Sequence, residues 1–366
     1  MFGLAAFALG WKLSNRDAVE APPARSVVEQ VRAELASRYY RPVPREVLRQ
    51  ASVESILAAL GDPYTEYLDP LAYRLLRHET ARSYSGIGAT VLPAKNGLEV
   101  TSLVAGPARG SGLRVGDRIV AVGGETIAGL AFEKALARIL GPEGSVLRLR
   151  VRRGTDVLEL RVVRRRIDAP VVSARLLAVR HGRRVGYVKL AACRAGAAQV
   201  LRNELRRLER AGASALVLDL RGNPGGLLDQ AVSVASLFLD RGVVVSVENA
   251  HHHGEVYEAK PSGATRLRLV VLVDRSSASA AEVVAAALHD NDRATLVGEN
   301  TFGKALVQTV TPLGNGAALR LTTARYLTPA GIDISRRGIE PDVLAIDDPR
   351  TAPDEALAAA LLELQR

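Results

Sequence analysis

The spacing of apolar residues changes along the chain, and each change predicts a different kind of segment. Residues 27–82 carry apolar side chains at helical spacing, for example in VVEQVRAELASRYY and PREVLRQASVESILAALG. Residues 84–166 show short alternating stretches punctuated by glycines, with one helical stretch at 130–141. The pattern therefore predicts two or three packing helices followed by a small β-rich module.

From residue 185 onward, strand-like and helix-like segments alternate. VGYVKL and ALVLDLR are typical of buried strands, and each is followed by a helical pattern. The unit recurs in RLVVLVDRSSASAAEVVAAALHD, after which ATLVGE, LVQTVTP and ALRLTTARYLT indicate strands. Nearly unbroken apolar strands that alternate with helices predict a partly parallel sheet covered on both faces.

The composition is that of a globular chain with more than one domain. Its 366 residues allow two domains, since single domains run to about 100–200 residues. With 48% hydrophobic and 24% charged residues, neither wholesale disorder nor a multi-span membrane protein fits. The single cysteine, Cys193, excludes an internal disulfide and a multi-cysteine zinc site.

The chain starts with MFGLAAFALGW, an apolar run of signal-peptide length that is too short for a confident spanning helix. Residues 1–26 are therefore a candidate signal or membrane anchor with a proline-containing linker. This start favours export, with membrane association through the N-terminus if the segment is retained.

The formal charge of +10 would favour anionic partners. Much of the excess lies in VLRLRVRRGTDVLELRVVRRR, where Leu147 and Leu149 alternate with Arg148 and Arg150 as in a hairpin with one solvated face. Stacking aromatics and a recognisable nucleic-acid motif are missing. We therefore expect no nucleic-acid partner.

The segment GENTFGKALVQ, at 298–308, has the glycine spacing of a phosphate-binding loop. Ala305 stands where that loop needs Ser or Thr, and residues 305–311 alternate like a strand where a phosphate loop would open a helix. A nucleotide site is therefore not expected. Lys304 can instead serve as a base, because burial lowers the pKa of a lysine from about 10.4 toward neutrality.

The turn SSASAAE, at 276–282, carries a candidate nucleophile. Ser279 and Glu282 have the spacing of a capping box, which by itself is the plainer interpretation. The same serine, at a strand-to-helix turn beside free amides and the positive end of a helix dipole, is also well placed to attack a carbonyl. His289 cannot be its base, because it lies ten residues further along one helix, which corresponds to about 15 Å.

No histidine pattern matches a metal site, and the triplet at 251–253 is expected to be an exposed loop. If the chain is extended after Gly303, residues 304, 306 and 308 share one face, so that the Gln308 carboxamide can orient the Lys304 amine. The glycine-rich turn of LVLDLRGNPGG follows a buried strand, where open α/β sheets place ligands. Its amides either furnish an oxyanion donor or only close a tight connection.

These motifs, together with DPYTEYLDP, GIGATV, GLRVGDRIVAVGG, LTTARYLTPAG and GIEPDV, resemble the carboxyl-terminal processing peptidases, the S41 serine proteases with an inserted PDZ domain. The resemblance covers about residues 30–345, in the family's order. It implies an α/β fold with a mixed-sheet protease core of ClpP/crotonase-like βαβ units. The implied divisions are an N-terminal helical region at 27–82, a PDZ domain at 84–166, the core at 167–350 and a C-terminal helix at 351–366.

The resemblance also implies roles for individual residues. Ser279 falls on the family's nucleophile, Lys304 on its base and Gln308 on the supporting glutamine. The oxyanion donors fall on the amides of Gly225 and Ala280. No cofactor or metal is implied.

Two positions depart from the family pattern, since it often has serine where this chain has Ala281 and glycine where it has Ala305. Neither position carries the proton chemistry, so we expect activity to survive. YSGIGATV falls on the PDZ carboxylate-binding loop, in which amides around Gly86, Ile87 and Gly88 take the terminal carboxylate of an extended peptide. From the residues alone, a plain bulge at the start of a strand is the alternative.

The function implied is a serine endopeptidase that recognises apolar protein C-termini through its PDZ domain and cleaves near them through an acyl-enzyme. The family works outside the cytoplasm, in the periplasm, at the cell surface or in the thylakoid lumen. A non-catalytic PDZ-type scaffold on a protease fold is the alternative, although a pure binder has no need of an unprotonated lysine. A further expectation is that the PDZ module covers the active site until a peptide docks. The sequence predicts neither the oligomeric state nor the individual substrate.

Overall fold

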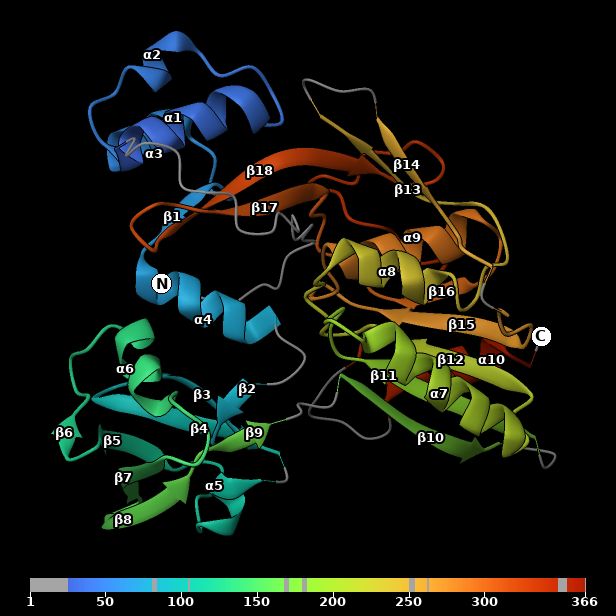
Figure 1. The fold of residues 1–366 in the computed structure, drawn as a ribbon. Helices are drawn as coiled ribbons and strands as arrows, with labels where there is room; N and C mark the ends of the chain where they lie inside the picture. Colours follow the sequence, from blue (N-terminus) through green and yellow to red (C-terminus); the bar gives the residue numbers. More distant parts are fainter. Residues whose placement is uncertain are drawn as a thin grey trace. The chain divides into compact units, whose positions relative to one another are not determined.

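The computed structural model (Figure 1) divides into two compact units, Met1–Tyr67 with Pro170–Arg366, and Leu68–Ala169. Most of the expected signal or anchor segment at 1–26, and the histidine triplet at 251–253, lie outside the described residues. The structure describes residues 26–80, 84–104, 106–167, 171–179, 183–249, 254–261, 263–347 and 354–365.

A six-stranded mixed sheet forms the centre of the first unit. In spatial order its strands are β10 (Val172–Ala178), β11 (Arg184–Leu190), β12 (Ala215–Asp219), β15 (Arg268–Val273), β16 (Thr295–Gly298) and β19 (Val343–Leu344). From β11 to β19 neighbouring strands run parallel, and β10 pairs antiparallel with β11. Every residue of β12 is buried, as expected of a strand covered on both faces. The predicted partly parallel sheet is confirmed.

Helices cover both faces of this sheet (Figure 1). They are α7 (Ala197–Arg210), α8 (Leu228–Ala235), α9 (Ala280–Asp290) and α10 (Glu355–Glu363). One apolar core joins α7, α8 and α9 to one face, and a second core joins α10 to the other. On α7 the buried residues Leu201, Leu205 and Leu208 recur at helical spacing, which explains why this segment forms a helix against the sheet.

A second, five-stranded sheet carries the N-terminal helices of the same unit. Its strands are β1 (Glu66–Leu68), β13 (Val243–Glu248), β14 (Glu255–Glu258), β17 (Leu306–Pro312) and β18 (Ala318–Leu327). The helices are α1 (Val27–Arg38), α2 (Arg45–Leu48) and α3 (Val53–Leu60). Ser26 and Glu29 close a capping box at the start of α1, and Gly61 ends α3 in the left-handed conformation. A third core joins these helices to Leu319 and Leu321 on β18.

The second unit is a small β-rich body with one helix of eleven residues and two shorter ones. Its main sheet contains β3 (Ala89–Ala94), β4 (Gly97–Leu103), β5 (Arg118–Val122), β6 (Glu125–Thr126), β7 (Val146–Arg153) and β8 (Asp156–Val163). The remaining elements are α4 (Pro70–Thr80), β2 (Tyr84–Gly86), α5 (Pro107–Gly110), α6 (Phe132–Ile139) and β9 (Arg165–Ile167). On β7, Leu147 and Leu149 are buried while Arg148 and Arg150 are exposed, so the predicted hairpin with a solvated face is confirmed.

The predicted α/β class is therefore confirmed, with a mixed-sheet core, a β-rich inserted unit and helices near the N-terminus. Within the residues that the structure describes, every helix falls short of the length and apolarity needed to cross a bilayer.

Candidate active site

The serine turn lies at the carboxyl end of β15 and opens α9. Ser279 is the cap of that helix, and its backbone has φ 57° and ψ −118°. A positive φ is rare outside glycine and costs about 1–3 kcal/mol, so the surrounding contacts must hold it in place. A strained serine between a buried strand and a helix is the geometry that presents a nucleophilic hydroxyl.

Those contacts converge on the carboxylate of Glu282, which is fully buried. Its Oε2 accepts from the amide of Ser279 at 2.8 Å and from the amide of Lys304 at 2.9 Å. Its Oε1 accepts from the Thr301 hydroxyl at 2.6 Å and from the Gly303 amide at 2.7 Å. Burial raises the pKa of Glu282, while these four donors favour its ionised form. One side chain thus ties the serine turn to the lysine segment.

The NPGG turn packs directly against the serine. A Cβ on Gly225, which has φ +99°, would meet the Ala278 carbonyl oxygen at 2.7 Å and the Ala280 amide nitrogen at 2.9 Å. Only glycine fits this position. The Gly225 amide donates to Asn223 Oδ1 at 2.9 Å, whereas the structure shows no hydrogen bond from the Ala280 amide to any described residue. Of the two expected oxyanion donors, Ala280 has an available amide and Gly225 has an engaged one.

Lys304 is buried, with 4% of its surface exposed. Burial, together with the nearby guanidinium of Arg320, lowers the pKa of its amine to about 7. The carboxylates of Glu282, Asp62 and Glu66 act in the opposite direction but more weakly than burial. An amine with a pKa near 7 is substantially neutral at physiological pH and can accept a proton.

The side chains around Lys304 complete the site. Its amine lies 4.8 Å from the centroid of the Tyr64 ring. The hydroxyl of Tyr326, on β18, donates to the Lys304 carbonyl oxygen and also interacts with the Ser279 side chain. Gln308 is fully buried, and neither polar atom of its carboxamide has a hydrogen-bond partner among the described residues. Buried amides are rarely left in this state, so Gln308 has a free donor and a free acceptor inside the protein.

The extended segment that would place residues 304, 306 and 308 on one face begins at Leu306. Lys304 precedes β17, which starts at Leu306, and the pairing with β18 shifts between Val307 and Gln308. Val307 pairs with Ala324 and Gln308 with Thr322, so the extra residue of this β-bulge is Thr323 on β18. The sequence does not reveal such a bulge, because the neighbouring threonines of β18 fit both registers.

In the second unit, the expected carboxylate loop joins β2 to β3. Gly88 has φ +78°, and a Cβ there would meet Val104 at 3.1 Å. The carbonyl oxygen of Ile87 accepts from the Ala108 amide at 2.8 Å, but no hydrogen bond from the amides of Ile87 or Gly88 is found within the described residues. Because β3 is an edge strand of its sheet, an extended peptide could pair with it.

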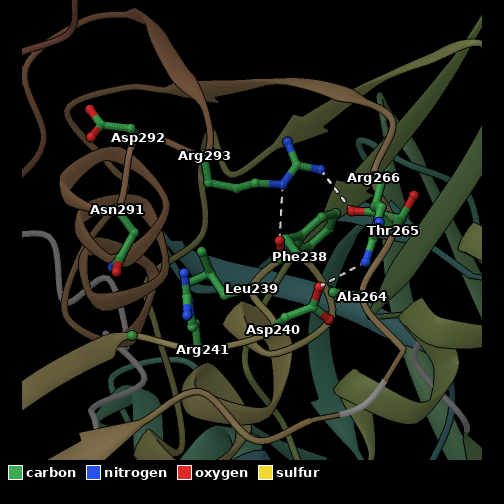
Figure 2. A pocket seen from close by; sticks show the side chains of 11 residues that line it. Phe238, Leu239, Asp240, Arg241, Ala264, Thr265, Arg266, Asn291, Asp292 and Arg293 are labelled. Carbon is green, nitrogen blue, oxygen red and sulfur yellow. Dashed lines mark hydrogen bonds and ion pairs between the residues drawn. The ribbon is translucent and has the colours of Figure 1, made fainter.

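A separate cavity of about 620 Å³ lies at the other end of the central sheet (Figure 2). There Arg293 donates from Nε to the Phe238 carbonyl oxygen at 2.9 Å and from Nη2 to the carbonyl oxygens of Thr265 and Leu267 at 2.9 and 2.7 Å. These residues lie at the amino ends of β15 and β16, opposite Ser279. The guanidinium thus joins the loops that carry Phe238, Thr265 and Leu267.

Sequence reasoning missed three residues of the site. Glu282 was interpreted as a helix cap, although it also holds the lysine segment. Tyr64 and Tyr326 lie in DPYTEYLDP and LTTARYLTPAG, motifs that indicated the family but gave these tyrosines no role. Long-range contacts of this kind leave no local periodicity to detect.

Comparisons with known proteins agree with this geometry. The model of peptidase family S41 matches residues 184–345, and a PDZ domain model matches residues 99–153. The carboxyl-terminal-processing protease of Synechocystis sp. is 39% identical over 307 residues, which are 82% of this chain and 72% of that protein. The carboxy-terminal processing protease CtpA of Bacillus subtilis is 33% identical over 315 residues, 85% of this chain and 67% of that protein. The solved structure of a photosystem II D1 C-terminal processing protease is similar, with a TM-score of 0.61, 30% identity and coverage of 93% of this chain and 97% of that one.

Proposed function

This chain belongs to peptidase family S41 and is a serine-type endopeptidase with a PDZ domain, and on that premise we propose that it cleaves proteins near their carboxyl termini, with Ser279 as nucleophile and Lys304 as base. The observation that carries the assignment is the Glu282 carboxylate, which accepts from the amides of both residues. A strained serine and a buried lysine share one anchor, as a catalytic pair requires.

In the proposed mechanism, the Ser279 hydroxyl attacks the scissile carbonyl while the neutral Lys304 amine takes its proton. The resulting ammonium gives that proton to the leaving amine, and the acyl-enzyme remains. Water then attacks the acyl carbon while Lys304 takes one of its protons, and the ester bond to Ser279 breaks as the ammonium returns that proton to the serine oxygen. The pKa of about 7 for the lysine supports this role, because the base must be neutral before each attack.

The supporting residues follow from the same arrangement. We assign the free carboxamide of Gln308 to orienting the Lys304 amine. The Ala280 amide serves as an oxyanion donor, and the Gly225 amide joins it when it releases Asn223. Exchanging one partner for another leaves the total number of hydrogen bonds unchanged.

Substrate selection is assigned to the second unit. Residues 84–166 form the PDZ domain, in which the amides of Gly86, Ile87 and Gly88 bind the carboxylate of an apolar C-terminus paired along β3. Residues 27–82, 167–350 and 351–366 form the helical region, the protease core and the C-terminal helix. The enzyme works outside the cytoplasm, after export or anchoring through residues 1–26.

A protein substrate with an apolar C-terminal tag tests the dyad. Ser279→Ala and Lys304→Ala should each lower kcat by about 10⁴–10⁶-fold. Ser276→Ala, an exposed serine of the same turn, is the matched control and should retain activity. In the wild type, kcat/KM should rise with pH and level off above about 7, since only the neutral amine is active. Activity retained by Lys304→Ala, or a rise centred near pH 10, would contradict the dyad.

The same substrate with a C-terminal amide tests recognition. Removing the terminal charge should raise KM by about 10-fold or more, because amides that bind a carboxylate gain charge-assisted hydrogen bonds. Equal KM values for acid and amide would remove the PDZ assignment. Binding without any turnover in the wild type would instead favour the scaffold.

A further inference from the structure

The ring of Tyr64 lies against the Lys304 amine. The distance from Nζ to the ring centroid is 4.8 Å. Within the described part of the chain, that amine makes no hydrogen bond and no ion pair, although three carboxylates influence it. A cation within about 6 Å of an aromatic centroid is attracted to the ring face. Tyr64 thus contacts the group that the proposed mechanism protonates.

The three carboxylates are engaged elsewhere. Glu66, on β1, forms an ion pair with Arg320 on β18 at 2.5 Å. Asp62 Oδ2 accepts from the hydroxyls of Thr65 and Thr322 at 2.7 Å each, and Glu282 on α9 accepts four hydrogen bonds. Because none of them takes the amine as a partner, the lone pair of its nitrogen stays available.

The position of the ring is built into the protein. Tyr64 follows α3, and its amide donates to Asp62 Oδ1 at 2.9 Å. The next residue, Thr65, is 5% exposed and accepts from the amide of the buried Thr322 at 3.1 Å. This network fixes the segment between α3 and β1 against the centre of β18. Hydrogen bonds to Asp62 before Tyr64, and between Thr65 after it and Thr322, therefore hold the backbone that carries the aromatic ring.

We propose that Tyr64 is a positioning residue of the active site, whose ring face locates the Lys304 amine and stabilises the ammonium ion formed when that amine takes the serine proton. The inference rests on the proposed function, since it concerns the lysine that the proposal makes the base. It also gives the N-terminal segment a part in catalysis, because Tyr64 belongs to none of the βαβ units that carry the other site residues.

An aromatic face suits a general base better than a carboxylate would. A carboxylate in contact would hold the amine as ammonium through a full opposite charge. A ring face stabilises the cation more weakly and leaves the nitrogen free to act as an acceptor. The guanidinium of Arg320 opposes this stabilisation from β18. Tyr64 and Arg320 therefore act on the same amine with opposite signs.

The test compares Tyr64→Leu, which removes the ring, with Tyr64→Phe, which keeps it. The matched control is Tyr67→Leu. It removes a ring that comes from the same segment but packs on the third core. The chain has only six lysines, so lysine labelled with ¹³C at Cε allows the Lys304 titration to be followed by NMR and assigned with Lys304→Met. This measurement uses the whole protein and does not depend on activity.

Tyr64→Leu should lower the pKa of Lys304 by about one unit and move the acid side of the kcat/KM profile to lower pH by the same amount. It should also reduce kcat by about 10-fold at the pH plateau, because the ammonium in the transition state loses its ring. Tyr64→Phe should restore both properties, and Tyr67→Leu should change neither. Arg320→Gln should raise the pKa of Lys304 and move the profile to higher pH.

A Lys304 titration and pH profile in Tyr64→Leu that match those of Tyr67→Leu would overturn the inference. If Tyr64→Leu does not fold, the Arg320→Gln titration decides, and an unchanged or lowered pKa there contradicts the described amine environment. If Ser279→Ala and Lys304→Ala are inactive but Tyr64→Leu has the wild-type Lys304 pKa and kcat, only the role of Tyr64 is contradicted and the dyad stands. Full activity of Lys304→Ala would remove the dyad and the catalytic role of Tyr64 together.

Discussion

Two basic residues enter the interior of the first unit, at opposite ends of its central sheet, and their surroundings differ. The Arg293 guanidinium donates from Nε and Nη2 to the backbone carbonyl oxygens of Phe238, Thr265 and Leu267, and Figure 2 draws the first two of these bonds. The Lys304 amine is more deeply buried, lies against the face of the Tyr64 ring and has no hydrogen bond or ion pair within the described residues. The Gln308 carboxamide likewise has no hydrogen-bond partner there. One cation holds loops together, and the other is left able to react.

The partners of a buried cation distinguish a structural role from a functional one. Burying a charge without partners costs free energy, so natural proteins rarely keep such a group unless function requires it. Replacing a hydrogen-bonded cation such as Arg293 should therefore lower stability and leave catalysis unchanged. Replacing Lys304 or Gln308 should lower catalytic activity and raise stability.

The largest effect is expected from Glu282→Gln, which keeps the shape of the anchor but replaces an acceptor with a donor. The two donors that now bind one carboxylate oxygen would face the new NH₂ group and lose their acceptor, so the serine turn and the lysine segment would separate. We expect kcat to fall by about 10²–10³-fold with little change in KM, and the free energy of unfolding to fall by about 3 kcal/mol. Glu299→Gln, whose partner Arg275 is exposed, is the control. An unchanged kcat would mean that Glu282 is only a helix cap.

Arg293→Met tests the structural side of the comparison. Removing the guanidinium leaves the carbonyl oxygens of Phe238, Thr265 and Leu267 without their donor, at about 1–3 kcal/mol for a buried group. We expect about 3 kcal/mol of lost stability in urea unfolding, with the pH profile of kcat/KM unchanged. Arg266→Met, whose ion pair with Asp240 is long at 3.9 Å and exposed, should cost less than about 0.5 kcal/mol. A shifted pH profile in Arg293→Met would break the proposed separation of roles.

Lys304→Met, the same kind of replacement at the other end of the sheet, should change the free energy of unfolding in the opposite direction. The amine has a pKa of about 7 in the folded protein and 10.5 as the ordinary value, so its burial opposes folding most strongly below pH 7. We expect the variant to be more stable than wild type by about 2 kcal/mol at pH 6 and to be inactive. The advantage should shrink as pH rises from 7 toward 10, because the wild-type amine then loses its proton in the folded state first. Urea unfolding at pH 6 and pH 9 measures both values, and a less stable variant at pH 6 would contradict the assignment.

The sequence predicted the elements better than the contacts between them. Alternation and helical spacing gave the mixed sheet, the arginine-rich hairpin and the helices, because burial of one face leaves a period in the chain. The family resemblance indicated Ser279, Lys304 and Gln308, while elementary chemistry explained why lysine rather than arginine fits the role. Spacing did not reveal the bulge at Thr323 of β18, since an inserted residue has no local signal. It also missed Glu282 and Tyr64 as partners of the lysine segment, because such contacts exist only after distant segments meet.

The smallest effect is expected from Gln308→Leu, and it tests the comparison most directly. Both polar atoms of this carboxamide lack partners, so leucine, which is similar in size, removes an unsatisfied group without opening a large cavity. We expect stability to rise by about 1 kcal/mol while kcat falls by about 10-fold, because the Lys304 amine loses the group that orients it. Gln199→Leu, on the exposed face of α7, should change neither quantity. A loss of stability in Gln308→Leu would show that the carboxamide has hydrogen-bond partners in the folded protein. It would contradict the idea that this site keeps polar groups free for catalysis.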